Sequence, residues 1–448
     1  MFFRHRLRTD FFQAAAKKRS GNCQERWFNR CNPLNLHHCS RPCDAEWLCY
    51  VPQRLPKVIR SVMLMKSNKY IRLTNALLFL AVTTLTAAVA DVSGKLQTLI
   101  DQAPEKGEVI VPRGIWKEPL VISKPLKLRG ASAEGSVLEI TADEPALRVT
   151  GKGSVELESL TIRWQRATSE RAVETHAALW VRDAPLTIRA VRFQAPAGNA
   201  RSPVAMHAMG FCAVKVEQCD IEGYEFPVQF SDGAQGTLSD CVIWKPGHAG
   251  ITVGPDCSVE VVRCLIAGSA YHGIRCTGGK LTATDNLVIG NKNRGFYLGN
   301  KSAQGVIRNN VILDNGTGIS GFSQSEVEVV NNLIAKSDFA ALDARDTCRL
   351  RVHRNVFLDN TRALVLFKES GKNRNVVQEN LHWGNKTDAE NFEPTPAFVR
   401  SDPQLKDIAN GDFAPADANL HKGHGLQDAT VMKALWVKWT ALLRNTRP

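Results

Sequence analysis

A short phrase recurs through this chain at a nearly fixed interval. It consists of a polar residue, then Cys or Asn, then two or three apolar residues, and we call its Cys or Asn the anchor. The anchors are Cys219, Cys241, Cys264, Asn286, Asn310, Asn332, Asn355 and Asn380. They are 22 to 25 residues apart, with β-branched residues alternating with polar ones between them. This period, without helical spacing, predicts a solenoid whose coils each contain three short strands.

Two further columns of residues fit the same coil. A glycine-led strand phrase starts at Gly250, Gly273, Gly295 and Gly318. Seven residues before each anchor from Cys219 to Asn355, the side chain is small, and these residues are Cys212, Ala234, Cys257, Gly279, Ala303, Ser325 and Cys348. Small residues at a fixed position predict a tightly packed interior corner. The cysteines of the repeats are then buried small residues, with one disulfide among Cys219, Cys241 and Cys264 left open.

Stacked coils should turn the anchors into a ladder. An Asn at a left-handed turn can bond the same residue one coil away and so satisfy backbone and side-chain groups together. Asn286 through Asn380 fit this role, and Cys fills the same slot in three earlier coils. The predicted fold is all-β, a right-handed single-stranded parallel β-helix. A cap helix around Leu96, Leu99 and Ile100 and an amphipathic helix containing Val431, Leu435, Trp439 and Leu442 should cover its open ends or sides.

The chain divides into four predicted parts. Residues 65–90 read as a secretory signal peptide, with a basic start, an apolar stretch over residues 73–89 and a cleavage site after Ala90. That stretch is short for an uncleaved membrane anchor. Residues 1–64 are then an upstream segment that translation from Met65 omits. The alternative is a basic, cysteine-bearing cytoplasmic tail or a small metal-binding knuckle on Cys23, Cys31, Cys39, Cys43 and Cys49. Residues 91–400 form the β-helix domain, and residues 401–448 form a C-terminal tail with the amphipathic helix.

The net charge of +13 belongs mostly to the part before residue 90. After that position the chain has 42 basic and 40 acidic residues. A balanced charge gives no argument for a nucleic-acid partner. We expect a secreted, periplasmic or cell-envelope protein that is monomeric and has no stable membrane insertion after signal cleavage.

The start of the β-helix domain has a recognisable pattern. It reads KLQTLIDQAPEKGEVIVPRGIWKEPLVISKPLKLRG, with a Val-Pro-x-Gly-x-Trp turn from Val111 to Trp116 and an Arg-Gly turn at Arg129. It resembles the opening of secreted right-handed β-helix proteins of the pectate-lyase-like superfamily, and the segment from Asp402 to Asp428 resembles their tails. The resemblance implies the pectin lyase fold, which hosts lyases, glycosidases, epimerases, esterases and proteins without known activity. Neither the paired aspartates of polygalacturonases nor the Asp-Pro-His-Asp string of mannuronan epimerases is present.

Outward residues of successive coils form columns about 4.8 Å apart. Alignment on the anchors puts one column at Trp180, His207, Gln229, Thr252, Arg275, Tyr297, Ser320, Leu342 and Val365. A column at the preceding turn contains Phe226, Ala249, His272, Arg294, Thr317, Phe339 and Arg362, and one residue earlier stand Glu225, His248, Tyr271, Asn293 and Gly316. The middle coils therefore gather two histidines, two arginines and two tyrosines, namely His248, Tyr271, His272, Arg275, Arg294 and Tyr297.

This patch suits a uronate sugar. We assign catalysis to His272, Tyr271, Arg275 and Tyr297: Arg pairs with the sugar carboxylate, a His or Tyr removes the C5 proton, and the other Tyr protonates the leaving oxygen. The predicted substrate-binding residues are Arg294, His248, His207, Trp180 and Gln229.

The predicted function is binding or processing of an acidic polysaccharide, by lyase or epimerase chemistry without a cofactor. Hydrolysis needs two facing carboxylates, and only Glu225 lies near the patch. The alternative is a non-catalytic β-helix that binds an envelope partner through the same face, and an ordinary solvated surface is a third interpretation. A calcium site is a further hypothesis, because turns contain Asp232, Asp240, Asp256 and Asp285.

Overall fold

The computed structural model describes residues 96–168, 176–196, 203–300, 302–367, 375–391, 398–417 and 423–445. The predicted upstream segment and the predicted signal peptide lie outside these residues. Within them, no helix has both the length and the apolar character that a membrane span requires.

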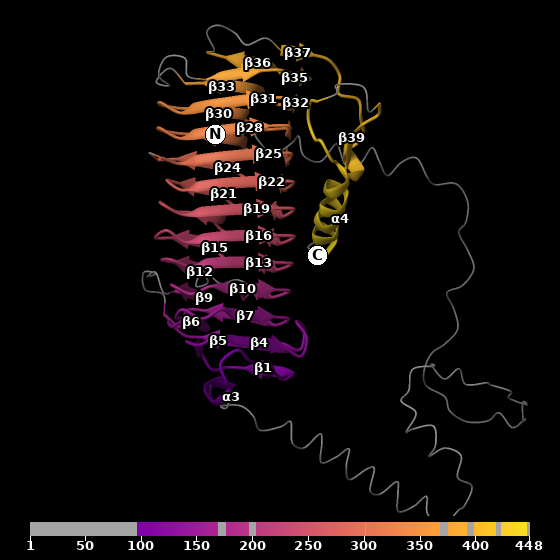
Figure 1. Ribbon diagram of the computed structural model, residues 1–448. Coiled ribbons are helices and arrows are strands. Elements are labelled where there is room, and N and C mark those ends of the chain that lie inside the picture. The colour runs from indigo at the N-terminus through magenta and orange to yellow at the C-terminus, as the bar shows by residue number, and fades with distance from the viewer. Residues whose placement is uncertain are drawn as a thin grey trace, which may run out of the picture. The chain divides into compact units, whose positions relative to one another are not determined.

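The described chain winds into a right-handed parallel β-helix, which confirms the predicted fold (Figure 1). The strands of the solenoid pair in parallel with the strands three positions away in the chain, so successive coils build three long sheets. The last strand of the second sheet instead lies beside the strand two positions before it. Figure 1 shows the coils stacked from helix α3 (Leu96–Gln102) at the indigo end toward the yellow C-terminal end. Leu96 and Ile100 of α3 are buried against the first coils, which confirms the cap helix.

The first sheet has 12 strands and alternates buried and exposed side chains along most of them. Its strands are β1 (Gly107–Val111), β4 (Leu126–Gly130), β7 (Val155–Glu158), β10 (Leu186–Arg189), β13 (Ala213–Glu217), β16 (Gln235–Ser239), β19 (Ser258–Val262), β22 (Lys280–Thr284), β25 (Gln304–Arg308), β28 (Glu326–Val330), β31 (Arg349–His353) and β34 (Val376–Gln378). Such alternation indicates one face on the core and one in water.

The second sheet has 13 strands, and from β17 to β32 they are buried on both faces. Its strands are β2 (Gly114–Trp116), β5 (Ser136–Thr141), β8 (Thr161–Gln165), β11 (Arg192–Gln194), β14 (Asp220–Glu222), β17 (Val242–Trp244), β20 (Leu265–Ala267), β23 (Leu287–Ile289), β26 (Val311–Leu313), β29 (Leu333–Ala335), β32 (Val356–Leu358), β35 (Asn380–Trp383) and β37 (Phe398–Arg400). Their apolar outer face needs a cover, which the tail supplies.

The C-terminal tail packs along the second sheet. It contains β38 (Leu405–Asp407), the short 3-10 helix η1 (Ile408–Asn410), β39 (Asp412–Pro415) and α4 (Thr430–Asn445). Phe413, Met432 and Leu435 are buried against the outer side chains of this sheet, and Trp439 meets Trp244 edge to face at 5.3 Å. The predicted amphipathic helix therefore covers a side of the solenoid, as Figure 1 also shows.

The third sheet also has 12 strands and contains the predicted functional columns. Its strands are β3 (Leu120–Ile122), β6 (Leu147–Thr150), β9 (Ala177–Arg182), β12 (Val204–Met209), β15 (Phe226–Ser231), β18 (Ala249–Val253), β21 (His272–Thr277), β24 (Arg294–Gly299), β27 (Thr317–Gly321), β30 (Ala340–Ala344), β33 (Arg362–Leu366) and β36 (Thr387–Glu390). From β9 to β30, many of its outward side chains are buried or half-buried.

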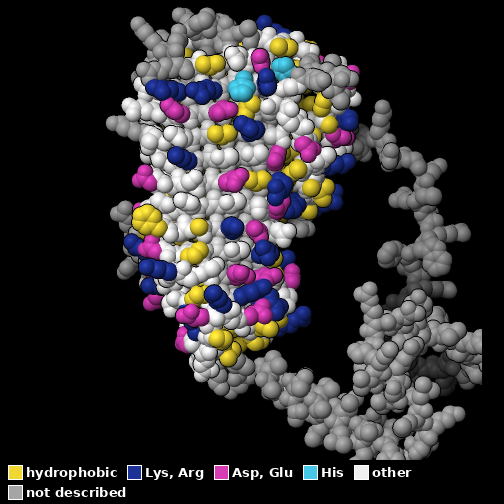
Figure 2. Space-filling view, viewed as in Figure 1, with side chains coloured by type: hydrophobic (Ala, Val, Ile, Leu, Met, Phe, Trp, Pro, Cys, Tyr) yellow, Lys and Arg dark blue, Asp and Glu magenta, His cyan; other side chains and the backbone are white. Residues whose placement is uncertain are grey.

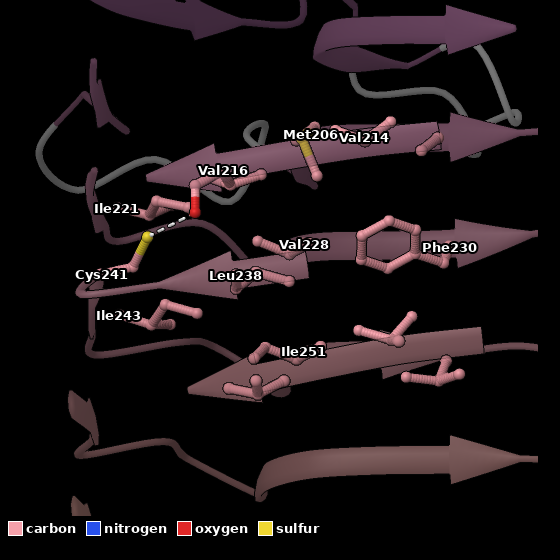
Figure 3. Close-up of a cluster of buried hydrophobic side chains, with 14 of the residues drawn as sticks. Met206, Val214, Val216, Ile221, Val228, Phe230, Leu238, Cys241, Ile243 and Ile251 are labelled. Carbon is pink, nitrogen blue, oxygen red and sulfur yellow. Dashed lines mark hydrogen bonds between the residues drawn. The ribbon is translucent and has the colours of Figure 1, made fainter. Parts of the chain in front are cut away.

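The interior is filled by columns of aliphatic side chains (Figure 3). Ile221 pairs in register with Ile243, and Val228 pairs with Ile251, so that like shapes stack from coil to coil. Each such side chain is at most 1% exposed, and burial of one Val or Ile is worth roughly 1.5 to 3 kcal/mol. Figure 3 also shows the Cys241 thiol donating to the carbonyl of Val216 at 3.5 Å.

The predicted asparagine ladder is present. Asn286 donates its backbone N–H and its Nδ2 to Oδ1 of Asn310, both at 2.9 Å, and Asn310 donates in the same way to Asn332. The left-handed backbone lies one residue before each anchor, as at Asn309 with φ 55°, and not at the anchor itself. The anchor is thus free to point inward and bridge two coils.

A second ladder runs five residues after the anchors, and the sequence analysis missed it. Asn291 donates its backbone N–H and its Nδ2 to Oδ1 of Asn315 at 3.0 and 2.9 Å, and Asn360 does the same to Asn385. The two ladders fix the turns on both sides of the second sheet.

The cysteines behave as the packing argument predicted. All seven in the described residues are free and buried. Cys219, Cys241 and Cys264 each donate a hydrogen bond from Sγ to a main-chain carbonyl two residues earlier, at 3.2 to 3.3 Å. The disulfide that the sequence left open is therefore not formed.

Replacement of a ladder residue should destabilise the solenoid. Asn310→Leu leaves the carbonyls of Ala283 and Arg308 and the N–H of Asn286 without their partner, so we expect a loss of about 1 to 3 kcal/mol in the free energy of unfolding. Urea denaturation measures it. The control is the exposed Gln304→Leu in the same coil, which should change stability by less than about 0.5 kcal/mol. An unchanged midpoint for Asn310→Leu contradicts the role given to the ladder.

Candidate functional site

The predicted outward column exists along most of the third sheet. Strand register places Trp180, His207, Gln229, Thr252, Arg275, Tyr297 and Ser320 directly beside one another in that order. At the start of the strands, Ala249, His272, Arg294 and Thr317 are likewise in register. The repeat spacing therefore gave the correct neighbours through these coils.

The prediction was wrong at the next coil. Ser320 pairs with Asp343 and Asp343 pairs with Val365, whereas Leu342 pairs with Ile319 and lies in the core. The turn between β29 and β30 is one residue longer than the turn between β26 and β27, and this shifts the alignment by one. Because side chains alternate between faces, the shift exchanges an apolar residue for a carboxylate.

The same longer turn moves the neighbouring column. Thr317 pairs with Ala340, where the sequence alignment had placed Phe339. Phe339 lies in the turn and is 36% exposed.

A cluster of aromatic rings occupies the middle coils. The His272 ring lies 4.1 Å from the Tyr271 ring and stacks on the Tyr297 ring at 5.1 Å, measured between centroids. His248 contacts Tyr271 at 4.9 Å and meets His272 edge to face at 6.1 Å. Tyr271 is 41% exposed, whereas His272 is only 3% exposed. The structure thus brings together the two histidines and two tyrosines that the sequence predicted.

Two guanidinium groups border this ring cluster. Arg294 donates from Nε to Ser320 Oγ and from Nη1 to Asn293 Oδ1, both at 2.8 Å, and its Cζ lies 5.7 Å from the Tyr297 ring. Arg275, half-buried one coil away, has no hydrogen bond or ion pair within the described part of the chain. Neither charge is compensated by a carboxylate there, so both can attract an anion.

Five of the eleven buried side-chain polar atoms that lack a partner among the described residues lie on or beside this sheet. They are Trp180 Nε1, His248 Nδ1, Thr252 Oγ1, His272 Nδ1 and Asp343 Oδ1. All five belong to the outward column or to the turn and strand start beside it. Since buried polar atoms are nearly always hydrogen-bonded, such a group indicates a face arranged for something other than stability.

The imidazoles of the patch are held neutral. Burial, followed by the charges of Arg294, His248 and Arg275, lowers the pKa of His272 to about 3. Burial and Arg275 also lower the pKa of His248, against a smaller opposing effect of Glu225. A neutral imidazole can accept a proton or a hydrogen bond.

The predicted binding residues at the N-terminal end of the column are more deeply placed. Trp180 is 6% exposed and packs with Ala177 and Met209, and Arg148 lies over its ring at 5.2 Å. His207 is 3% exposed, with Nε2 3.0 Å from Ser231 Oγ. Trp180 lies four coils and His207 three coils from Arg275, so neither belongs to the ring cluster. Gln229 is half-buried and lies two coils from Arg275.

A second group of aromatic and charged residues continues the patch, and the sequence analysis missed it. Arg345 donates from Nε and Nη2 to Oδ2 of Asp343, and its Cζ lies 3.9 Å from the ring of Phe367 and 5.1 Å from that of Phe322. Phe322 also lies 5.0 Å from the Tyr297 ring. A comparison of turn lengths from coil to coil would have predicted that Asp343, rather than Leu342, belongs to the outward column.

The aspartates of the calcium hypothesis serve the turns. Asp232, Asp240, Asp256 and Asp285 all have positive φ, between 56° and 60°. Asp240 pairs with Arg263 at 2.8 Å. No group of three or more His, Cys, Asp or Glu side chains in the described ranges is arranged to hold a metal ion.

A different face carries a shallow hollow of about 780 Å³. It lies on the first sheet, from β22 to β34. Its charged side chains are partly paired, as in Arg349 with Glu326 at 2.8 Å, and none of the buried unpartnered atoms of the described residues lines it. Figure 2 shows basic and acidic side chains interspersed over the visible surface. We place the candidate site on the third sheet because its polar groups lack partners there.

Comparisons with known proteins agree on the fold. A family model described as a periplasmic copper-binding protein (NosD) matches residues 204–392. The A-module of a mannuronan C-5 epimerase from Azotobacter vinelandii is 12% identical with a TM-score of 0.50, over 69% of this chain and 95% of the module. A mannuronic acid specific family 6 lyase from human gut microbiota is 12% identical with a TM-score of 0.43, over 78% of this chain and 97% of the enzyme. No curated protein matches. At 12% identity, the likeness to the epimerase module confirms the predicted β-helix fold and nothing finer.

The family description raises the question of copper. Copper favours thiolate and imidazole ligands. The thiols of Cys219, Cys241 and Cys264 are fully buried and already hydrogen-bonded to the main chain, and the described residues contain no metal-binding cluster. These residues do not fit a copper centre.

The buried imidazole of His272 should make stability depend on pH. Its pKa is about 3 in the folded chain against an ordinary 6.5, so between these values the unfolded chain binds a proton that the folded chain does not. The free energy of unfolding should therefore fall as the pH drops through this window, by at most about 1.4 kcal/mol per pH unit from this residue. His272→Gln should flatten the dependence, as measured by urea denaturation.

Above about pH 7.5 the two proteins should share one pH dependence, because the imidazole is neutral in both states. Equal slopes of wild type and His272→Gln at acid pH contradict the desolvated imidazole.

Proposed function

We propose that this chain is an envelope β-helix protein that binds an acidic polysaccharide along the third sheet and transforms a uronate there by elimination or epimerisation. The observation that carries the proposal is Arg275. It is a half-buried cation without a partner among the described residues, and it stands in register beside Tyr297 and three residues after His272 on the same strand. A carboxylate pairs with such a guanidinium in a bidentate, charge-assisted contact.

The proposed chemistry uses side chains of the patch and no cofactor. Arg275 neutralises the uronate carboxylate, which makes the C5 proton more acidic. The neutral imidazole of His272, or Tyr271 in its phenolate form, accepts that proton. In elimination, the bond from C4 to the glycosidic oxygen breaks, a C4–C5 double bond forms, and Tyr297 donates a proton to the leaving oxygen. In epimerisation, the C4–oxygen bond stays intact and Tyr297 donates a different proton to C5 from the opposite side.

Hydrolysis fits this geometry poorly. A glycosidase needs two carboxyl groups at most about 10 Å apart. The carboxylates beside the patch are Glu225, which precedes β15, and Asp343 in β30, five coils further along. Five coil spacings amount to roughly 24 Å. Asp343 is also already paired with Arg345.

The comparisons support the polysaccharide and the location in a limited way. The structural neighbour from Azotobacter vinelandii is a mannuronan epimerase, and mannuronan is a uronate polymer. The family model that matches residues 204–392 describes a periplasmic protein, in keeping with the predicted signal peptide over residues 65–90. We propose a monomer in the periplasm or cell envelope.

A non-catalytic role is the second candidate. Two observations favour it: the family description names a binding protein, and His272 is only 3% exposed. In this case the same face binds an acidic glycan and leaves it unchanged.

Arg275 should dominate binding of a short uronate oligosaccharide. Arg275→Ala removes a charge-assisted contact worth about 1.5 to 3 kcal/mol, so affinity measured by calorimetry should fall about tenfold or more. Thermal stability should hardly change, because the guanidinium bonds no described residue.

The matched control is Arg362→Ala on β33 of the same sheet. That guanidinium is already paired with Glu390 at 2.8 Å, so its loss should leave affinity unchanged. Equal affinities for the two variants would identify the patch as ordinary solvated surface.

Turnover separates the two candidate functions. The wild-type protein, incubated with a panel of uronate polymers, should produce unsaturated uronates detectable by absorbance or an altered C5 configuration detectable by NMR. His272→Ala should abolish that turnover while oligosaccharide affinity stays within about twofold, because the imidazole contributes to proton transfer rather than charge pairing. Binding without turnover by the wild type would establish the non-catalytic role.

A further inference from the structure

The patch does not end at Tyr297. Beyond it, the ring of Phe322 is approached by two guanidinium groups: Cζ of Arg294 lies 5.0 Å and Cζ of Arg345 lies 5.1 Å from the ring centroid. Arg345 also lies 3.9 Å from the centroid of Phe367. Cations over aromatic faces are held in place by the ring quadrupole. Two long side chains that are usually mobile are thus fixed on the outer surface, two coils apart.

A buried carboxylate holds one of these cations. Asp343 is 0% exposed, and its Oδ2 accepts hydrogen bonds from Nε and Nη2 of Arg345 at 3.1 and 3.0 Å. The Arg345 side chain itself is 33% exposed. Asp343 thus binds two nitrogens on one edge of the guanidinium. The third nitrogen, Nη1, has no hydrogen-bond partner among the described residues.

The charges around Phe322 favour an anion. Asp343 and Arg345 cancel one another, but Arg294 is bonded only to the neutral Ser320 and Asn293. Its Nη2 likewise has no partner within the described residues. Arg294, Asp343 and Arg345 together therefore have one positive charge in excess and two unpartnered guanidinium nitrogens, which can hold a carboxylate. The nearby carboxylate of Asp346 accepts a hydrogen bond from the main-chain N–H of Ser323 at 3.2 Å.

Strand register places Arg294 one coil from Arg275 and Arg345, at the far end of the group, further along the solenoid. Arg345 follows β30, which lies three coils beyond β21 and its Arg275. At one interstrand spacing per coil, this is roughly 14 Å along the axis. That separation is too long for one sugar ring and suits a chain of several sugars.

We propose that Arg294, Phe322 and Arg345 form a second subsite that binds a carboxylate of the same polysaccharide, with Asp343 as the residue that positions Arg345. The inference rests on the proposed function and deepens it. A uronate chain lies parallel to the solenoid axis, with one carboxylate at Arg275 and a later one at this second subsite. The ring of Phe322 supports the apolar face of a sugar between them.

Chain length tests the proposal. Calorimetry with a uronate disaccharide and with the matching hexasaccharide should show tighter binding of the hexasaccharide by wild type. Arg345→Ala should weaken hexasaccharide binding about tenfold, because a charge-assisted contact is lost, and should leave disaccharide binding unchanged. Arg345→Lys should be intermediate, since an ammonium keeps the charge without the planar fork.

The role of Asp343 has its own readout. Asp343→Asn should weaken hexasaccharide binding in the wild-type background and should have no effect on binding in the Arg345→Ala background, which a double-mutant cycle measures. A purely structural carboxylate would lower the thermal midpoint in both backgrounds with binding unaffected, and this would overturn the positioning role. The control is Arg349→Ala in the same coil, which pairs with Glu326 on the first sheet and should change neither affinity.

Two results would overturn the proposal in different ways. If Arg345→Ala bound the hexasaccharide as tightly as wild type while Arg275→Ala did not, the second subsite would be wrong and the proposed function would stand. If wild type bound neither oligosaccharide, the proposed function would fall and the subsite with it.

Discussion

In-register stacking of parallel strands is the constraint on which this structure depends. Each coil repeats the one before it, so interior residues such as Ile221 and Ile243 form columns, and so do the residues of the outer faces. The ladder amides make the stacking directional, because the Oδ1 of Asn310 accepts from both the backbone and the side chain of Asn286. The position of a residue three coils away along the solenoid is therefore fixed by the regular spacing between neighbouring strands. This rigidity is what lets a few outward side chains form a site at all.

Much of the fold could be predicted from the sequence because the ladder residues are chemically distinctive. An Asn at a fixed period has few structural explanations, and Asn286 and Asn332 were assigned correctly for that reason. The second ladder was missed although Asn291 and Asn315 stand at a constant five residues after their anchors. Serines replace asparagine in two of its coils, at Ser269 and Ser337, and this obscures the period.

The candidate site was less predictable because it depends on turn lengths. In the segment Ala340-Ala341-Leu342-Asp343-Ala344, small apolar residues stand on both sides of the strand, so alternation does not reveal which face is inside. One extra residue in the preceding turn decides the question and brings Asp343 outward beside Ser320. A period measured at the anchors carries no information on such local shifts. The aromatic contacts of Phe322 and Phe367 were hidden for the same reason.

The outward column of the third sheet is costly for stability. A buried polar atom without a partner costs about 1 to 3 kcal/mol, and this column contains Trp180 Nε1, Thr252 Oγ1 and Asp343 Oδ1. The neighbouring aliphatic core and the two ladders can offset that cost, since they repeat in many coils. The first sheet, where Arg349 and Glu326 pair, shows that this chain can pair surface charges where no binding role is proposed.

The balance of charges also bears on how an acidic polymer would be attracted. With 42 basic and 40 acidic residues after position 90, long-range steering is weak, so in the proposed function affinity has to come from local contacts with cations of the patch that no described carboxylate pairs, such as Arg275 and Arg294. In the proposed function, such a surface would select its ligand by the spacing of the anionic groups along it rather than by total charge.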